Sequence, residues 1–338
     1  MNRAVVPSST RTQRDPRVSV VMPFLNAQQF IQEAIDSVRA QTYSSWELLL
    51  VDDGSSDGST EIALRYAGQY PRQIRYLVHD GHENRGISAS LNRGIHHAAG
   101  EYIALLDADD VWLPQKLEQQ VVILDSYPEV GMLYGAAQYW YSWTGKPEDR
   151  ERDCIPQYGV QPNTLLQPPK LLTLFLQGAA PVPCPCSVLL RRKVIGAITF
   201  EESFRRIFTD QVFYAKVCLK VPVFVSSECW ARYRKHPASS CAVVGRTGQL
   251  NAARLIFLDW LAKYLTQQGV DDPEIWHALR HKQRRHRHLT LYRLLERARH
   301  PVAQIDGLSK LIARRILPPP IHSWLKVHWS QVGSSARQ

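Results

Sequence analysis

Short apolar runs alternate with amphipathic stretches along the first third of the chain. The runs are rich in β-branched residues, which predicts buried strands, and they cover residues 18–24, 46–51, 74–79 and 102–106. Between the runs, apolar residues recur three or four positions apart, which predicts amphipathic helices. Strands that alternate with helices in this way favour an α/β fold with a mostly parallel sheet flanked by helices.

The pattern becomes less regular after residue 106. Apolar spacing predicts a helix that begins at Pro114, a strand over 130–141 and, after a polar and proline-rich loop, a strand over 182–190. The loop, 142–169, is long enough to be a candidate lid. Further on, the spacing predicts a helix over 210–219, short strands over 221–226 and 228–233, and helices from Gly248 onwards.

Polar side chains follow the predicted strands where each one ends. Asn26 follows the first strand, Asp52 and Asp53 follow the second, and three carboxylates follow the fourth, namely Asp107, Asp109 and Asp110. Ligands of open α/β sheets bind at the carboxyl ends of the strands. Adjacent carboxylates repel one another unless a divalent cation lies between them, because hard cations take oxygen ligands. The alternative is a helix start capped by Asp109 or Asp110.

The positive charge is concentrated at one end of the chain. The net charge is +10, and residues 280–338 hold 13 lysines and arginines against two acids, a net +11 that leaves −1 for residues 1–279. A basic segment of this kind is compatible with nucleic acid, anionic lipid or an acidic partner. Residues 1–17 lack the apolar core of a signal peptide, and no run reaches the ~18–20 apolar residues of a spanning helix.

Two long stretches together resemble a known family. VSVVMPFLNAQQFIQEAIDSVRAQTYSSWELLLVDDGSSDGS and ENRGISASLNRGIHHAAGEYIALLDADDVWLPQKLEQQ closely resemble the inverting glycosyltransferases of family 2. This resemblance covers roughly residues 18–240 and implies a GT-A type fold with a nucleotide-sugar-binding sheet. The domains expected are a disordered segment 1–17, a GT-A domain 18–240 with a nucleotide-sugar half 18–128 and an acceptor half 129–240, and a basic helical extension 241–338.

The resemblance also assigns the donor site. Asp107-Ala108-Asp109 corresponds to the DxD motif, which would hold Mn²⁺ or Mg²⁺ and the donor diphosphate. In that motif Asp109 would be the direct ligand, whereas Asp107 would hold ribose or a metal-bound water. Asp53 would accept the imide N–H of uracil, although an Asx-turn is the alternative. Other nucleotide-sugar-binding residues would be Pro23, Phe24, Asn26, Asn84 and Arg85.

Two residues of the second half complete the expected site. Asp210 lies where the family has its catalytic base, although Thr209 replaces the usual preceding glutamate, and an N-cap is the alternative role. The segment RYRKHPASS resembles the family's YRxHxxS, in which His236 would be a third metal ligand or a phosphate contact. Trp140, Trp143 and Tyr139 are either a stacking surface for the acceptor sugar or part of the core.

The expected function is therefore a metal-dependent inverting glycosyltransferase, of hexosyltransferase type, for polysaccharides of the cell envelope. It would transfer one sugar from a nucleotide-sugar, with UDP favoured, to a hydroxyl of a glycan or lipid-linked acceptor. The expected location is cytoplasmic, with residues 280–338 either touching the anionic inner face of the membrane or packing on the core. Alternatives are a sugar-1-phosphate nucleotidyltransferase, although FLNAQQF has no glycine to grip a triphosphate, and a basic nucleic-acid-binding protein, although no nucleic-acid motif is present.

Overall fold

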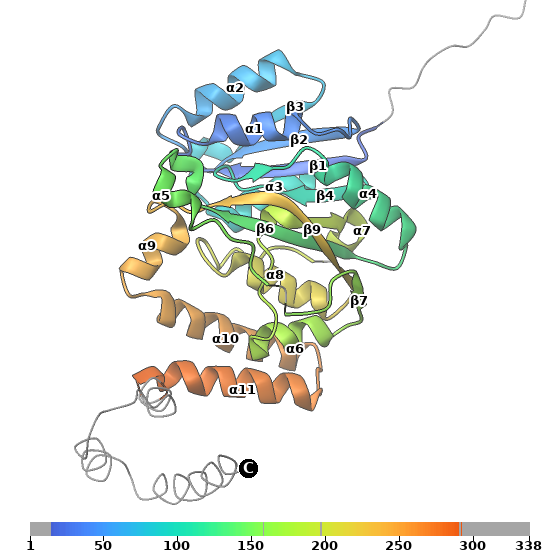
Figure 1. Cartoon of the computed structure of the whole chain (residues 1–338), viewed down its shortest axis with the longest axis vertical. Helices are drawn as coiled ribbons and strands as arrows, with labels where there is room; N and C mark the ends of the chain where they lie inside the picture. The colour runs from blue at the N-terminus through green and yellow to red at the C-terminus, as the bar shows by residue number, and fades with distance from the viewer. Residues whose placement is uncertain (1–14, 158, 197, 291, 293–338) are drawn as a thin grey trace, which may run out of the picture. The chain divides into compact units, whose positions relative to one another are not determined.

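The computed structural model describes residues 15–157, 159–196, 198–290 and 292 of the 338-residue chain (Figure 1). The chain divides into two compact units, Met1–His286 and Arg287–Gln338. Nearly all of the second unit lies outside the described residues, as does most of the N-terminal segment. The predictions for residues 1–14 and for most of the basic tail therefore concern residues that the structure does not describe, whereas residues 15–17 are described.

The first half of the chain forms the expected alternation of parallel strands and helices. Its elements are β1 (Val18–Phe24), α1 (Ile31–Arg39), β2 (Trp46–Asp52), α2 (Ser59–Gln69), β3 (Ile74–Val78), α3 (Ile87–His97) and β4 (Tyr102–Leu105), with a 3-10 turn, η1, at Asp80–His82. The strands lie in the order β3-β2-β1-β4, and all three pairings are parallel. The α/β fold is confirmed, and each of the four strands predicted in this half is present.

The second half makes the sheet mixed. It adds β5 (Val111–Trp112), α4 (Lys116–Ser126), β6 (Met132–Trp140), η2 (Ser142–Thr144), α5 (Pro147–Arg150), β7 (Thr164–Leu166), α6 (Lys170–Gln177), η3 (Pro185–Ser187), β8 (Val188–Arg191), α7 (Arg192–Ile195), α8 (Thr209–Cys218), β9 (Val223–Arg234), α9 (Ser240–Arg246), α10 (Leu250–Gln267) and α11 (Pro273–Arg287). The nine-stranded order continues β4-β8-β6-β9-β5, with β7 also on β9. Strand β8 runs antiparallel to both of its neighbours, β4 and β6.

Several predicted elements of this half are wrong in detail. The strand predicted over 182–190 is confined to β8, because Pro183 and Pro185 remove backbone donors that a central strand needs. The two short strands predicted over 221–233 are one strand, β9, which pairs with β6 through register shifts near Ala136. The predicted loop 142–169 contains η2, α5 and β7. Helix α4 begins at Lys116, just after Pro114.

Each face of the sheet is buried under its own set of helices. Alternate residues of β1 point to opposite faces, so Val20 and Met22 pack with α1 and α4, whereas Val21 packs with α3, α6 and α8. Helices α10 and α11 belong to this second layer through Phe257, Leu258, Leu261 and Ile275. Burying one such side chain stabilises the fold by about 1.5–3 kcal/mol.

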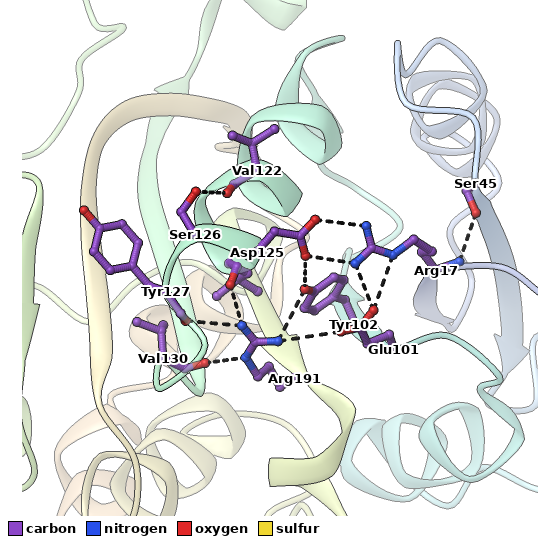
Figure 2. Close-up of polar contacts among 11 residues, drawn as sticks. Arg17, Ser45, Glu101, Tyr102, Val122, Asp125, Ser126, Tyr127, Val130 and Arg191 are labelled. Carbon is purple, nitrogen blue, oxygen red and sulfur yellow. Dashed lines mark hydrogen bonds and ion pairs between the residues drawn. The ribbon is translucent and has the colours of Figure 1, made fainter.

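A polar network joins the amino end of β4 to β8 and α4 (Figure 2). Arg17 forms ion pairs with Asp125 at 2.8 Å and with Glu101 at 2.9 Å. The buried guanidinium of Arg191 donates to the carbonyl oxygens of Val130 at 2.8 Å and Leu124, and to the hydroxyl of Tyr102 at 3.3 Å. This network fixes the edge of the sheet opposite to the carboxyl end of β4.

Within the part of the chain that the structure describes, no helix has the length and apolar character needed to cross a membrane.

Candidate active site

The predicted site residues of the first half lie along one edge of the sheet. Phe24 pairs with Asp52, and the N–H of Asp53 donates to the carbonyl oxygen of Phe24 at 2.9 Å. Strand β4 lies on the side of β1 opposite to β2. Just after β4, the N–H of Leu106 donates to the carbonyl oxygen of Val21 at 3.1 Å. The ends of β2 and β4 are thus two strand spacings apart, roughly 10 Å, which is a distance that a nucleotide can span.

Asp53 holds the loop that follows β3 by hydrogen bonds to its backbone. Its carboxylate accepts the backbone N–H of Arg85 at 2.8 Å and that of Gly86 at 3.0 Å. Gly54, in the left-handed region at φ +84°, lies so close to this loop that a Cβ would be 2.8 Å from the nitrogen of Asn84. A carboxylate has about four acceptor positions, so Asp53 keeps capacity for one further donor.

The other residues that the sequence assigns to donor binding differ in their solvent exposure. Pro23 and Phe24 are buried in β1, whereas Asn26 is exposed at φ 50° and its side-chain oxygen accepts the N–H of Ser56 at 2.8 Å. Asn84 and Arg85 are exposed, and Arg85 lies 3.5 Å from the carboxylate of Glu83. Among these residues, the exposed ones line the loops after β1 and β3.

Three carboxylates converge after β4. One oxygen each of Asp107, Asp109 and Asp110 lies within 4.8 Å of the others, and we call this group the acid triad. Burial, together with the charges of Asp109 and Asp210, raises the pKa of Asp107 to about 7. Asp110 is fully buried and accepts the N–H of Arg234 at 2.9 Å, while its second oxygen has no hydrogen-bond partner among the described residues.

The helix-cap alternative for the acid triad is wrong. Asp110 precedes β5, and the residue at the start of α4 is Gln115, without a side-chain cap. A buried carboxylate oxygen without a donor is costly unless a cation or proton satisfies it. Carboxylate oxygens are also the ligands that Mn²⁺ and Mg²⁺ prefer, so the residues present fit a divalent cation.

His236 lies directly against this triad, as the sequence motif implied. Its Nε2 is 2.9 Å from a carboxylate oxygen of Asp109. The imidazole is held by Phe30, at 4.7 Å between ring centroids, and by Trp143, at 6.4 Å. The indole N–H of Trp143 donates to the carbonyl oxygen of Lys235 at 3.0 Å, so Trp143 supports His236.

The sequence assigned no role to Arg234, whose side chain hydrogen-bonds to the backbone of the acid triad. The side chain is buried among Phe30, Trp140 and Trp143. Its guanidinium donates to the carbonyl oxygen of Asp109 at 2.7 Å and to Glu33 at 2.6 Å. Its position two residues before His236, within RYRKHPASS, was the only signal in the sequence. Trp140 packs against Arg234, with 4.4 Å between the ring centroid and the guanidinium carbon.

Asp210 is the second residue of α8 and does not cap it. The cap residue is Phe208, which has the left-handed conformation at φ 62°, and Asp210 accepts the N–H of Gln211 at 2.8 Å. Burial raises the pKa of Asp210 to about 6. The charge of Asp210 also contributes to the raised pKa of Asp107. The N-cap alternative is wrong, because Phe208 is the cap residue of α8.

A cavity lies elsewhere in the described part of the chain. It has a volume of about 690 Å³, contains none of the predicted site residues, and is lined by residues such as Asn92, His96, Arg192, Thr199 and Glu201. The chemistry of the acid triad, rather than the size of a cavity, marks the candidate site.

Fold and site together define an α/β protein with a carboxylate cluster at the strand ends that suits a nucleotide and a cation. Residues 19–199, more than half of the chain, match the family described as glycosyl transferase family 2, and the chain belongs to this family. It is 41% identical over 145 residues to a putative glycosyltransferase, EpsE, of Bacillus subtilis, a match that covers 43% of this chain and 51% of EpsE. An uncharacterized glycosyltransferase of Rickettsia bellii is 43% identical over 192 residues, 56% of this chain and 25% of that protein. The chain thus spans about half or less of these relatives.

Solved structures share the fold at low identity. The mannosyltransferase PcManGT of Pyrobaculum calidifontis, in complex with GDP-Man and Mn²⁺, has a TM-score of 0.55 at 18% identity, over 96% of this chain and 87% of that one. S. aureus TarS 1–349 in complex with UDP-GlcNAc has a TM-score of 0.51 at 19% identity, over 65% and 59%. At these identities the likeness establishes the fold, which is of the GT-A glycosyltransferase type.

Proposed function

We propose that this protein is a metal-dependent inverting glycosyltransferase that moves one sugar from a nucleotide-sugar, with UDP favoured, to a hydroxyl of a glycan or lipid-linked acceptor. The observation that carries the proposal is the convergence of residues from distant parts of the chain. His236 lies 2.9 Å from Asp109 of the acid triad, and the charge of Asp210 acts on Asp107, where it contributes to the raised pKa. The complexes of PcManGT with GDP-Man and Mn²⁺ and of TarS with UDP-GlcNAc support a nucleotide-sugar donor.

The proposed reaction needs a base and a stabilised leaving group. The acceptor hydroxyl oxygen attacks the anomeric carbon, its proton passes to the carboxylate of Asp210, and the bond to the diphosphate oxygen breaks with its electron pair. Attack from the side opposite to the diphosphate inverts the anomeric centre. Asp107, Asp109 and His236 would hold a divalent cation, which when bound supplies positive charge to the departing diphosphate.

The buried environment of Asp210 suits its proposed role. A carboxylate whose pKa is raised to about 6 is a stronger base than an exposed one and is still ionised at neutral pH. The exposed residues Asn26, Asn84 and Arg85 would contact the nucleotide, while Asp53 positions the loop to which Asn84 and Arg85 belong.

The proposal is tested with a panel of UDP-, GDP- and dTDP-sugars, each with Mn²⁺, with Mg²⁺ and with a chelator, in binding and transfer assays. Asp109→Ala should abolish metal-dependent donor binding. Asp210→Asn should retain donor binding and lose transfer by a factor of about 10²–10⁴. Its thermal stability at neutral pH should not fall, because a buried charge is removed. Transfer by Asp210→Asn at the parent rate would contradict the assignment of the base.

A further inference from the structure

Residues 198–208 lead into α8, whose second residue is the proposed base, and we call them the connecting segment. The segment is tied to α8 near its start, because Lys216 donates to the carbonyl oxygen of Thr199 at 3.1 Å and pairs with Glu201 at 3.1 Å. Its last residue, Phe208, is the cap residue of α8. The first turn of α8 therefore depends on where the connecting segment lies.

The middle of the connecting segment is bonded to α3, a helix of the other half of the chain. The N–H of Phe200 donates to the side-chain oxygen of Asn92 at 2.9 Å, and the amide of Asn92 donates back to the carbonyl oxygen of Phe200 at 3.0 Å. The buried hydroxyl of Ser88 donates to the carbonyl oxygen of Phe204 at 2.6 Å. Ser88 and Phe204 are 116 positions apart, so the connecting segment joins the two halves of the chain.

Arg205 extends this junction to the loop after β3. Its guanidinium donates to the carbonyl oxygen of Asn84 at 2.7 Å and to the side-chain oxygen of the same residue at 3.2 Å. Its own carbonyl oxygen accepts the N–H of Ile87 at 3.4 Å. A Cβ at Gly86, where φ is +91°, would lie 3.0 Å from the Cβ of Arg205, so glycine permits this close approach. Side chain and backbone of Arg205 together hold both ends of this turn.

The next residue, Arg206, provides a contrast. Both arginines are exposed, but within the described part of the chain the side chain of Arg206 has no hydrogen bond or ion pair, whereas that of Arg205 is bonded twice to Asn84. Exposed hydrogen bonds contribute little net stability, because water replaces them when they break. Arg205 can therefore be replaced without unfolding the protein, and the effect of its bonds lies in the position that they give to Asn84.

We propose that Arg205 is a positioning residue that joins the loop after β3 to the helix of Asp210, so that a nucleotide bound against this loop also holds the proposed base in place. A nucleotide that contacts Asn84 favours the arrangement in which Asn84 is fixed, and the bonds of Arg205 extend this arrangement to the connecting segment. This inference rests on the proposed function, because it takes Asn84 as a nucleotide contact and Asp210 as the base.

The test is hydrogen–deuterium exchange of the full chain, followed by mass spectrometry, with and without UDP and Mn²⁺. In the parent, the nucleotide should slow exchange both in residues 83–87 and in residues 200–212. In Arg205→Ala it should slow exchange in the loop alone, and UDP affinity should fall about fivefold because Asn84 loses two hydrogen bonds. At saturating donor, kcat should also fall about tenfold or more, whereas support of the loop alone would change only KM.

Two further variants separate the bonds of Arg205 from a general effect on the segment. Arg206→Ala is the matched control and should respond to UDP as the parent does. Arg205→Lys keeps one donor for the carbonyl oxygen of Asn84, so it should recover part of the response in residues 200–212. A loss of response in Arg206→Ala as large as that in Arg205→Ala would contradict the proposal, because any change in the segment would then have the same effect.

The remaining outcomes distinguish this inference from the proposed function. A parent in which UDP protects the loop but not residues 200–212, or an Arg205→Ala variant that keeps both responses, overturns the inference and leaves the proposed function standing. A parent that binds none of UDP, GDP and dTDP with Mn²⁺ refutes the proposed function instead. Exchange without nucleotide then still decides on the junction: Arg205→Ala should exchange faster than the parent in both stretches, and equal exchange would show that Arg205 does not join them.

Discussion

At the residue scale, burial changes the pKa of side chains that look ordinary in the sequence. Asp210 and Asp107 are ordinary carboxylates in the sequence, yet desolvation raises their pKa values to about 6 and about 7. An exposed aspartate would be ionised at any pH above about 4. The environment therefore decides which carboxylate holds a proton near neutrality, and this has a measurable consequence.

The first prediction concerns the pH dependence of transfer. The proposed base, Asp210, can accept a proton only when it is ionised, so the rate of transfer should rise with pH up to a plateau above about 6. A bound divalent cation favours the charged form, so the midpoint in the loaded enzyme should lie at about 6 or below. A profile of kcat/KM against pH measures this. A rate that falls as the pH rises through this range would contradict the role of Asp210.

The second prediction concerns Arg234, whose contacts depend on the planar fork of arginine. Lysine would keep the charge but lose simultaneous bonding to Glu33 and to the carbonyl oxygen of Asp109. Arg234→Lys should weaken Mn²⁺-dependent UDP binding by about tenfold, measured by calorimetry. Arg232→Lys, an exposed residue of the same strand, is the control. Unchanged binding by Arg234→Lys would show that the acid triad does not need this support.

At the element scale, the loops after β2 and β3 behave as one unit. The Asp53 carboxylate bonds the second loop, and Gly54 packs against its backbone with no space for a side chain. Only glycine combines this conformation with so close an approach. The proposed donor site is therefore bordered by two loops in mutual contact, and the conformation of each depends on the other.

The third prediction separates close packing from backbone strain at these loops. Gly54→Ala should destabilise the protein by about 1–3 kcal/mol and weaken donor binding, because Cβ would press on the backbone of Asn84 and His82. Gly145→Ala is the matched control, since Gly145 has a similar φ of +78° with open space around it. Denaturant unfolding and UDP titration measure both effects. Equal losses in the two variants would rule out a role for the loop contact.

What the sequence could predict differs between the two halves for a physical reason. The strands and site residues of the first half are encoded locally, by apolar periodicity followed by polar ends. The position of β8 between β4 and β6 depends on pairings between distant segments, which periodicity does not encode. Arg234 was not assigned for the same reason, because its contacts with Asp109 and Glu33 arise only when β9 packs. His236 and Asp210 were placed by motif resemblance, beyond the residues 19–199 that match the family.

At the scale of the whole molecule, the sheet is stabilised at the edge opposite to the site. Arg191 donates to carbonyl oxygens near the end of α4 and to Tyr102 at the start of β4, so it joins three elements (Figure 2). Arg17 lies on the exposed side of the same network.

The fourth prediction compares these two arginines. Arg191→Met should destabilise the protein by about 3 kcal/mol, because the buried carbonyl oxygens of Val130 and Leu124 would lose their hydrogen bonds from Arg191. Arg17→Gln should cost at most about 1 kcal/mol, because exposed ion pairs contribute little. Denaturant unfolding measures both. Similar losses for the two variants would show that burial does not set the importance of the network.

The bond between His236 and Asp109 has a consequence for biosynthesis. Its two partners are 127 positions apart in the chain, so a nascent polypeptide emerging from the ribosome exposes the acidic motif long before the histidine exists. During that interval the partly synthesised sheet carries the carboxylates of the acid triad without Trp143 and His236 beside them. Completion of β9 thus almost coincides with completion of the candidate site, and a product that ends before His236 would lack the bond to Asp109.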